Sequence, residues 1–199
     1  MNLNKLRDEI HDNAVKHGFW EGERSIAECL VLIHSEVSEA LEADRNGKYA
    51  KGNIKPETIE WMAKTWEKIT FLENFILKVK DTFEDELADV VIRCLDLCGH
   101  LEIELDPQFS ETIEETVKNN DTWFEDMESV PDKLCVVHYR ISKCFECRAD
   151  CTYTLDTKLT DVVACVMELC VDLNIDLLKH VELKMKYNET REYKHGKKY

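Results

Sequence analysis

Apolar residues recur at helical spacing along most of the chain. Between residues 23 and 44, one helical face carries Leu30, Ile33, Val37 and Leu41. Gly47 follows this stretch as a helix stop signal. A second long helix is predicted to begin near Phe83, and its apolar residues lie almost all round it, which is typical of a helix at the centre of a bundle.

Two further helices complete the predicted fold, which is an all-α helical bundle. Residues 56–80 begin with a proline, which is favoured in the first turn of a helix, and an amphipathic stretch covers about residues 3–17. The 199 residues include only 3 Pro and 6 Gly. So few turn residues argue against a many-stranded sandwich or a glycine-rich phosphate loop.

The second half of the chain repeats the helical pattern of the first. Residues 30–42 align with 134–146, and this alignment pairs His34 with His138 and Ser38 with Ser142. Residues 87–105 align with 159–177, with nine of nineteen positions identical. Two paired segments in the same order indicate an internal duplication.

The duplication predicts a single domain, residues 1–199, in which one chain forms a pseudo-dimer. Repeat 1 covers about residues 1–106, repeat 2 covers about residues 131–180 and is degenerate, and a basic tail covers residues 184–199. Repeat 1 has 32 extra residues between its paired helices, which correspond to the helix predicted at 56–80. The pseudo-dimer is either complete alone or pairs again as a homodimer.

Two pairs of acidic residues stand out in repeat 1. They are Glu36-x-x-Glu39 and Glu86-x-x-Asp89, and residues three apart lie on one face of a helix. If the two helices pack antiparallel, four carboxylates meet, and their repulsion favours a bound cation. Oxygen ligands suit Mg²⁺ or Mn²⁺ better than zinc. The alternative is a solvated acidic face, which is common in a chain with 41 Asp and Glu.

Repeat 2 differs from repeat 1 at these positions. Arg140, Lys143 and Lys158 stand where repeat 1 has Glu36, Glu39 and Glu86, and only Asp161 remains acidic. This exchange of acids for bases indicates that one copy has kept a cation site and the other has lost it. The alternative is that opposite charges pair between the two copies.

The acidic motifs resemble those of a known family. The runs at 32–42 and 83–93 are similar to the E-x-x-E and E-x-x-D signature of the all-α nucleoside triphosphate pyrophosphohydrolases, which include MazG-like proteins, dimeric dUTPases and dCTP pyrophosphatases. The resemblance extends to residues 9–20 and to the tail at 184–197. Two departures are the 46 residues between Glu39 and Glu86, a longer gap than usual, and Ser35, where many MazG-like proteins have a second Glu.

The resemblance implies Mg²⁺-dependent hydrolysis of a nucleoside triphosphate to the monophosphate and pyrophosphate, for nucleotide pool control or removal of abnormal nucleotides. Mg²⁺, or Mn²⁺, is then held by Glu36, Glu39, Glu86 and Asp89. Glu36 and Glu39 are the expected catalytic residues, with Glu39 as the base. A catalytically inactive nucleotide- or protein-binding member of the same fold is the alternative.

The tail supplies the cations that a triphosphate needs. Residues 184–199 contain six Lys and Arg against two Glu. The resemblance assigns Lys186, Asn188, Arg191 and Lys194 to the phosphates of the substrate. Trp20 and Asn13 are the residues expected at the base. Two alternatives stay open: the tail is simply a basic extension, and Trp20 belongs to the core.

Net charge restricts the classes of binding partner, and the cysteines bear on the class of protein. With 41 Asp and Glu against 26 Lys and Arg, the net charge of −15 disfavours nucleic acid and membrane surfaces. The polar N-terminus and the lack of a long apolar run predict a cytoplasmic protein. The nine cysteines are interpreted as reduced core thiols. Cys144, Cys147 and Cys151 also fit a rival class, a cysteine-based redox or metal protein.

Overall fold

The computed structural model describes residues 2–50, 56–65, 67–105, 124, 126–147 and 154–196. All regular structure in these residues is helical, which confirms the all-α class. The α-helices are α1 (Leu3–Lys16), α2 (Ile26–Arg45), α3 (Pro56–Lys64), α4 (Lys68–Lys78), α5 (Phe83–His100), α7 (Val130–Glu146), α8 (Leu155–Asp172) and α9 (Leu177–Asn188). A short 3₁₀ helix, η1 (Tyr193–Gly196), follows α9.

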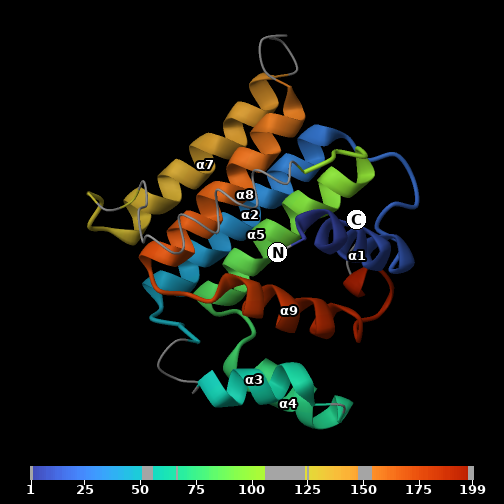
Figure 1. Cartoon of the computed structure of the whole chain (residues 1–199), viewed down its shortest axis with the longest axis vertical. Coiled ribbons are helices and arrows are strands. Elements are labelled where there is room, and N and C mark those ends of the chain that lie inside the picture. The colour runs from blue at the N-terminus through green and yellow to red at the C-terminus, as the bar shows by residue number, and fades with distance from the viewer. Residues whose placement is uncertain are drawn as a thin grey trace.

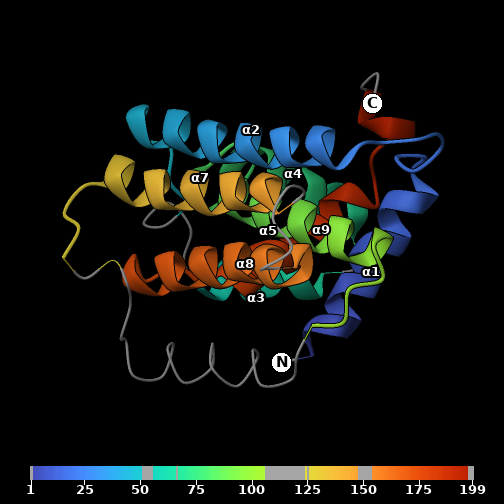
Figure 2. The same ribbon diagram turned by 90° about the horizontal axis from the view of Figure 1, so that it is seen from above.

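Helices α2, α5, α7 and α8 form the bundle at the centre of the molecule (Figures 1 and 2). Both α2 and α8 pack against α5 and against α7. Helices α2 and α5 run in opposite directions, as the colour gradient in Figure 1 shows. Helices α1 and α9 also pack on α5, so α5 is the central helix, as its apolar residues predict.

Side-chain caps fix where the bundle helices begin. The side chains of Ser25, Thr82 and Ser129 accept hydrogen bonds from backbone N–H groups three residues ahead, at the starts of α2, α5 and α7. The first turn of α5 carries Glu84, Asp85 and Glu86, and negative charge is favourable at a helix N-terminus. The N-terminus of the central helix therefore favours the acidic side chains that the sequence puts there.

The single helix predicted at 56–80 is wrong, because the structure has two helices, α3 and α4, in this segment. Met62 of α3 packs in a small apolar cluster with Phe71 and Phe75 of α4 and Leu183 of α9. One continuous helix would place Met62 and Phe71 on opposite faces, since each residue turns the helix by about 100°. The chain therefore bends between Lys64 and Lys68, and the α3–α4 pair lies beside α9, outside the bundle (Figure 1).

The cysteines are mostly core residues, as the sequence predicts. Of eight described cysteines, all without disulfides, six are buried. Cys135 is exposed, Cys147 is half-buried, and Cys151 lies outside the described residues. Within the described part of the chain, no cysteine joins a cluster suited to a metal ion. No described helix is long and apolar enough to cross a membrane.

Candidate metal and substrate site

Three of the four predicted carboxylates meet between α2 and α5. One oxygen from each of Glu36, Glu86 and Asp89 lies within 4.8 Å of the others. Glu36 and Glu86 are buried, with exposed fractions of 4% and 5%, and Asp89 is half-buried. The antiparallel pairing of the two helices and the three-residue spacing on α5 bring these groups together.

The fourth predicted ligand, Glu39, is not part of this cluster. Its carboxylate lies one turn further along α2, lines the same cavity, and accepts a hydrogen bond of 3.1 Å from the Ser35 hydroxyl. Ser35 therefore contacts the carboxylate of Glu39.

Two cations that the sequence analysis did not single out contact the cluster. Lys184 of α9 is buried, and its Nζ lies 2.7 Å from an oxygen of Asp89 and 2.7 Å from an oxygen of Asp85. Arg93 of α5 forms an ion pair with Glu36. Among the described residues, no hydrogen bond or ion pair reaches the carboxylate of Glu86.

Burial and mutual repulsion perturb the acids of the cluster. Burial and the charge on Asp89 raise the pKa of Glu86 to about 8. Burial also raises the pKa of Glu36, although Arg93 opposes the change. Burial acts to lower the pKa of Lys184, but the carboxylates of Asp89 and Asp85 outweigh it and raise that pKa. The three carboxyl groups therefore outnumber their two cations and resist ionising together, which fits a site where a divalent cation with oxygen ligands would neutralise them.

The cluster faces a cavity of about 270 Å³ between α1, α2, α5 and α9. Three of the predicted substrate contacts line this cavity, namely Asn13, Asn188 and Arg191. Asn188 is buried, and its side-chain oxygen has no hydrogen-bond partner within the described structure. Lys80, Arg24, Asp96 and Phe19 also line the cavity, and the sequence analysis did not select them. The cavity thus combines a carboxylate cluster with cationic, polar and apolar groups.

The other three predicted substrate contacts do not line the cavity. Lys186 donates hydrogen bonds to the carbonyl oxygens of Met62 (2.9 Å) and Thr65 (2.6 Å), at the end of α3. Trp20 stacks on His100, with 3.8 Å between ring centroids, and its Nε1 donates to Asp96. Lys194 lies in η1, where its ammonium group is 5.7 Å from the centroid of the Tyr193 ring.

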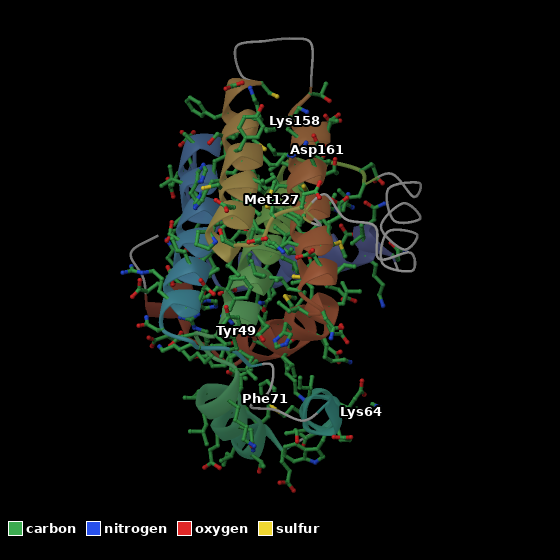
Figure 3. All side chains as sticks on the ribbon, turned by 90° about the vertical axis from the view of Figure 1, so that its left-hand side faces the viewer. Tyr49, Lys64, Phe71, Met127, Lys158 and Asp161 are labelled. Carbon is green, nitrogen blue, oxygen red and sulfur yellow. The ribbon has the colours of Figure 1, made fainter. Side chains whose placement is uncertain are left out.

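The positions of α7 and α8 that align in sequence with the acidic motifs hold a salt-bridge cluster. The Asp161 carboxylate lies 2.9 Å from Nζ of Lys158 and 3.9 Å from Nη1 of Arg140. Figure 3 shows Lys158 and Asp161 near the start of α8. Lys143, on the exposed side, pairs with Glu146 at 2.7 Å. Basic side chains therefore neutralise Asp161, at positions that align in sequence with the acids of α2 and α5.

The segment after α9 folds back on the end of α1 beside the cavity. The backbone N–H of Lys194 donates to the carbonyl of His17 at 2.8 Å, and the hydroxyl of Tyr193 donates a hydrogen bond to the carboxylate of Glu21. Gly18 has φ +80°, and a Cβ added there would lie 2.1 Å from the Tyr193 ring. Only a glycine at position 18 therefore allows this close contact.

Replacing Gly18 with Ala should detach the C-terminal segment. We expect a loss of about 1–2 kcal/mol in the free energy of unfolding, because the substitution adds strain at positive φ to a steric clash. Urea unfolding measures this loss, and faster trypsin cleavage after Arg191 reports the detachment. Gly47→Ala is the matched control, since Gly47 has φ +64° with open space around it. Equal cleavage of the two variants would contradict the contact.

The site draws its residues from helices distant in sequence. Helix α2 supplies Glu36 and Glu39, α5 supplies Glu86, Asp89 and Arg93, and α9 supplies Lys184 and Asn188. This arrangement can hold an oxygen-liganded cation beside a cavity that also carries cationic side chains. Comparison of the chain with known protein families, curated proteins and solved structures finds no match.

Proposed function

We propose that the protein is a Mg²⁺-dependent nucleoside triphosphate pyrophosphohydrolase, which converts a (d)NTP and water to the (d)NMP and pyrophosphate. The observation that carries this proposal is the buried cluster of Glu36, Glu86 and Asp89, which faces a cavity also lined by Arg191 and Lys80. A site that combines acids and bases in this way suits a substrate that arrives as a complex of a cation with an anion. Nucleotide pool control or removal of abnormal nucleotides is the role that this reaction serves.

Glu36, Glu86 and Asp89 are the residues that would hold Mg²⁺, which polarises phosphate oxygens and offsets the charge that develops on them. Arg93 and Lys184 orient the carboxylates of Glu36 and Asp89 through their ion pairs. Mn²⁺ fits the same oxygen ligands.

Glu39 is the proposed base. Its carboxylate lines the cavity and orients the attacking water, from which it accepts a proton. The water oxygen forms a bond to the α-phosphorus, the bond from that phosphorus to the α,β-bridging oxygen breaks, and pyrophosphate leaves with the electron pair. Arg191 donates hydrogen bonds to the phosphate oxygens, for which its guanidinium is well shaped.

A panel of canonical and modified nucleoside triphosphates with Mg²⁺ tests the proposal. We expect one pyrophosphate and one monophosphate for each triphosphate consumed, and no turnover in the presence of EDTA. Release of single phosphates would contradict the reaction. Binding of nucleotides without turnover would favour the alternative, a catalytically inactive nucleotide-binding protein of the same fold.

We further propose that the bundle is a MazG-like pseudo-dimer, in which α2 and α5 of repeat 1 correspond to α7 and α8 of repeat 2. Equivalent residues of two copies meet where a twofold axis passes between them. His34 and His138 are such a pair, and their Nδ1 atoms lie 2.8 Å apart with the rings stacked. The clustering of Arg140, Lys158 and Asp161 also supports this correspondence.

This histidine pair should make stability depend on pH. Burial lowers the pKa of both His34 and His138, and the charge on His138 lowers that of His34 further. Protonation therefore favours the unfolded chain, so the contribution of the pair is present above about pH 6.5 and is lost below it. Because both rings are only half-buried, the loss should stay below about 1 kcal/mol. Thermal unfolding from pH 5 to 8 should show a flatter dependence in His34→Leu/His138→Leu than in the wild type, whereas parallel curves would contradict the assignment.

A further inference from the structure

The cavity has a second polar end, away from the carboxylate cluster. Asp96 lies on the same helix as Asp89, seven residues further on, which corresponds to about 10 Å along the axis of α5. Arg24 and Phe19, from the segment before α2, line the same cavity, as do Asn13 of α1 and Ile92 of α5. The guanidinium of Arg24 lies 5.6 Å from the centroid of the Trp20 ring, and Trp20 is hydrogen-bonded to Asp96. A nucleotide with its phosphates at the cluster would extend its base in this direction.

Asp96 is held in place by two neighbouring side chains. Its Oδ1 accepts a hydrogen bond from Nε1 of Trp20 at 2.8 Å and lies 2.8 Å from Nδ1 of His11. The hydrogen bond to Asp96 raises the pKa of His11, which favours the imidazolium form beside the carboxylate. Within the described residues, no hydrogen bond reaches Oδ2 of Asp96. Asp96 is therefore a fixed carboxylate with one oxygen available as an acceptor.

Arg24 supplies a donor that lacks a partner. The side chain is only 9% exposed, and its Nε donates to Glu28 at 3.0 Å while Nη1 donates to the carbonyl of Phe19 at 3.5 Å. Its Nη2 is buried, and no hydrogen-bond acceptor for it exists among the described residues. A buried donor without a partner costs free energy unless a ligand supplies the acceptor. Arg24 lines the cavity, so a small turn of its guanidinium group would let a ligand there supply the acceptor.

We propose that Asp96 and Arg24 read the edge of the nucleobase and select bases with an exocyclic amino group beside a ring nitrogen, as in cytosine and adenine. This inference rests on the proposed function of the site. The carboxylate can only accept and the guanidinium can only donate, so together they match an amine next to an acceptor. Uracil and hypoxanthine place a carbonyl oxygen where the amine stands, and this oxygen repels the Asp96 carboxylate.

Trp20 is expected at the base from the sequence, but its contacts in the structure indicate a different role. Its ring packs on His100 and its N–H holds Asp96, so it is a positioning residue, as is His11. Phe19 and Ile92 line the cavity and provide apolar surface that the base can contact. Base selection in this site thus depends on a polar pair held by neighbours that do not touch the base.

Binding of non-hydrolysable nucleotides tests this inference without any turnover. We would measure dissociation constants by calorimetry, with Mg²⁺ present, for the α,β-imido analogues of dCTP, dUTP, dATP and dITP. The wild type should bind the amino base of each pair about tenfold to a hundredfold more tightly than its oxo counterpart. Asp96→Asn should lose this preference, because an amide offers a donor as well as an acceptor. Asp12→Asn removes one exposed charge next to His11 and should keep the preference.

Equal binding of amino and oxo bases by the wild type, or an unchanged preference in Asp96→Asn, would overturn the inference, as would absence of binding. Arg24→Gln changes the other member of the pair and should also reduce the preference for amino bases at least about fivefold. This second variant keeps the test valid if Asp96→Asn fails to fold. A different result would contradict the proposed function. Selective binding without pyrophosphate release would support base reading and contradict the hydrolase.

Discussion

Replacing Glu86 with Gln should lower kcat/KM for nucleoside triphosphate hydrolysis by about 100-fold to 1,000-fold, the usual effect of removing one group that stabilises transition-state charge. Glu86 is the cleanest position for this test. Its carboxylate takes part in the cluster, yet no described residue pairs with it, so an isosteric amide leaves Arg93 and Lys184 with their partners. The loss would therefore report on the cation site and not on a broken ion pair.

The same substitution should raise the thermal midpoint in metal-free buffer. Burial and Asp89 raise the pKa of Glu86 from 4.5 to about 8, so its ionisation in the folded protein is unfavourable. This cost grows between about pH 4.5 and pH 8 and reaches its full size above pH 8. A neutral amide removes the cost, and an increase of a few degrees is expected at pH 8.5. The stabilisation that Mg²⁺ gives to the wild type should also disappear. Lower activity together with higher metal-free stability separates a functional acid from a structural one.

Asp161→Asn is the matched control for the cation site. Asp161 aligns with Asp89 in the sequence, and its partners are Lys158 and Arg140. Because these pairs are partly exposed, their loss should cost at most about 1 kcal/mol and leave kcat/KM within about twofold of the wild type. An equally large loss of activity in Asp161→Asn, or full activity in Glu86→Gln, would contradict the assignment of the site to repeat 1.

The carboxylate cluster could be predicted because it depends on local periodicity and one assumption about packing. Glu86 and Asp89 share a face of α5 through their spacing, and the antiparallel pairing with α2 brings Glu36 to them. The position of Glu39 could not be predicted in the same way. One turn separates it from Glu36, and whether that turn reaches the cluster depends on the crossing of the two helices.

In the tail, helical periodicity identifies the residues at the cavity better than the family resemblance does. Lys184, Asn188 and Arg191 are spaced by four and three residues, so they share one side of α9 and its continuation, and this side meets the cavity. Lys186 is two residues from Lys184, about 200° round the helix, and contacts α3 instead. The family resemblance selected Lys186 and did not assign Lys184 to the site, although the helical pattern separates the two residues.

The arrangement of α3 and α4, and the end of the cavity that contains Asp96, depend on long-range contacts that the local sequence does not encode. The bend after Lys64 exists because Met62 and Phe71 share an apolar cluster with Leu183, which lies more than a hundred residues away in the sequence. The contact between Trp20 and Asp96 likewise joins α5 to the segment after α1. Such pairings arise from tertiary packing, which overrides local preference.

Replacing Lys184 with Met should destabilise the protein by about 3–5 kcal/mol at pH 8, because it leaves buried carboxylates without their cation. Lys184 is 5% exposed and its Nζ contacts both Asp85 and Asp89, of which Asp85 is fully buried. Burial raises the pKa of Asp85 to about 7 even with Lys184 present. A carboxyl whose pKa is raised in the folded state takes up a proton on folding, so the penalty should shrink as the pH falls below 7.

Urea unfolding at pH 5.5 and pH 8 measures both the size and the sign of this effect. Lys179→Met is the matched control, since Lys179 lies on the same helix and pairs with the exposed Glu182 at 2.7 Å. That surface pair should contribute less than about 1 kcal/mol, with little dependence on pH. A penalty for Lys184→Met that is small, or that grows toward low pH, would contradict the role of Lys184 as the buried counter-ion. The expected result would instead establish that a base 95 residues from Asp89 in sequence holds the carboxylate cluster together before any cation binds.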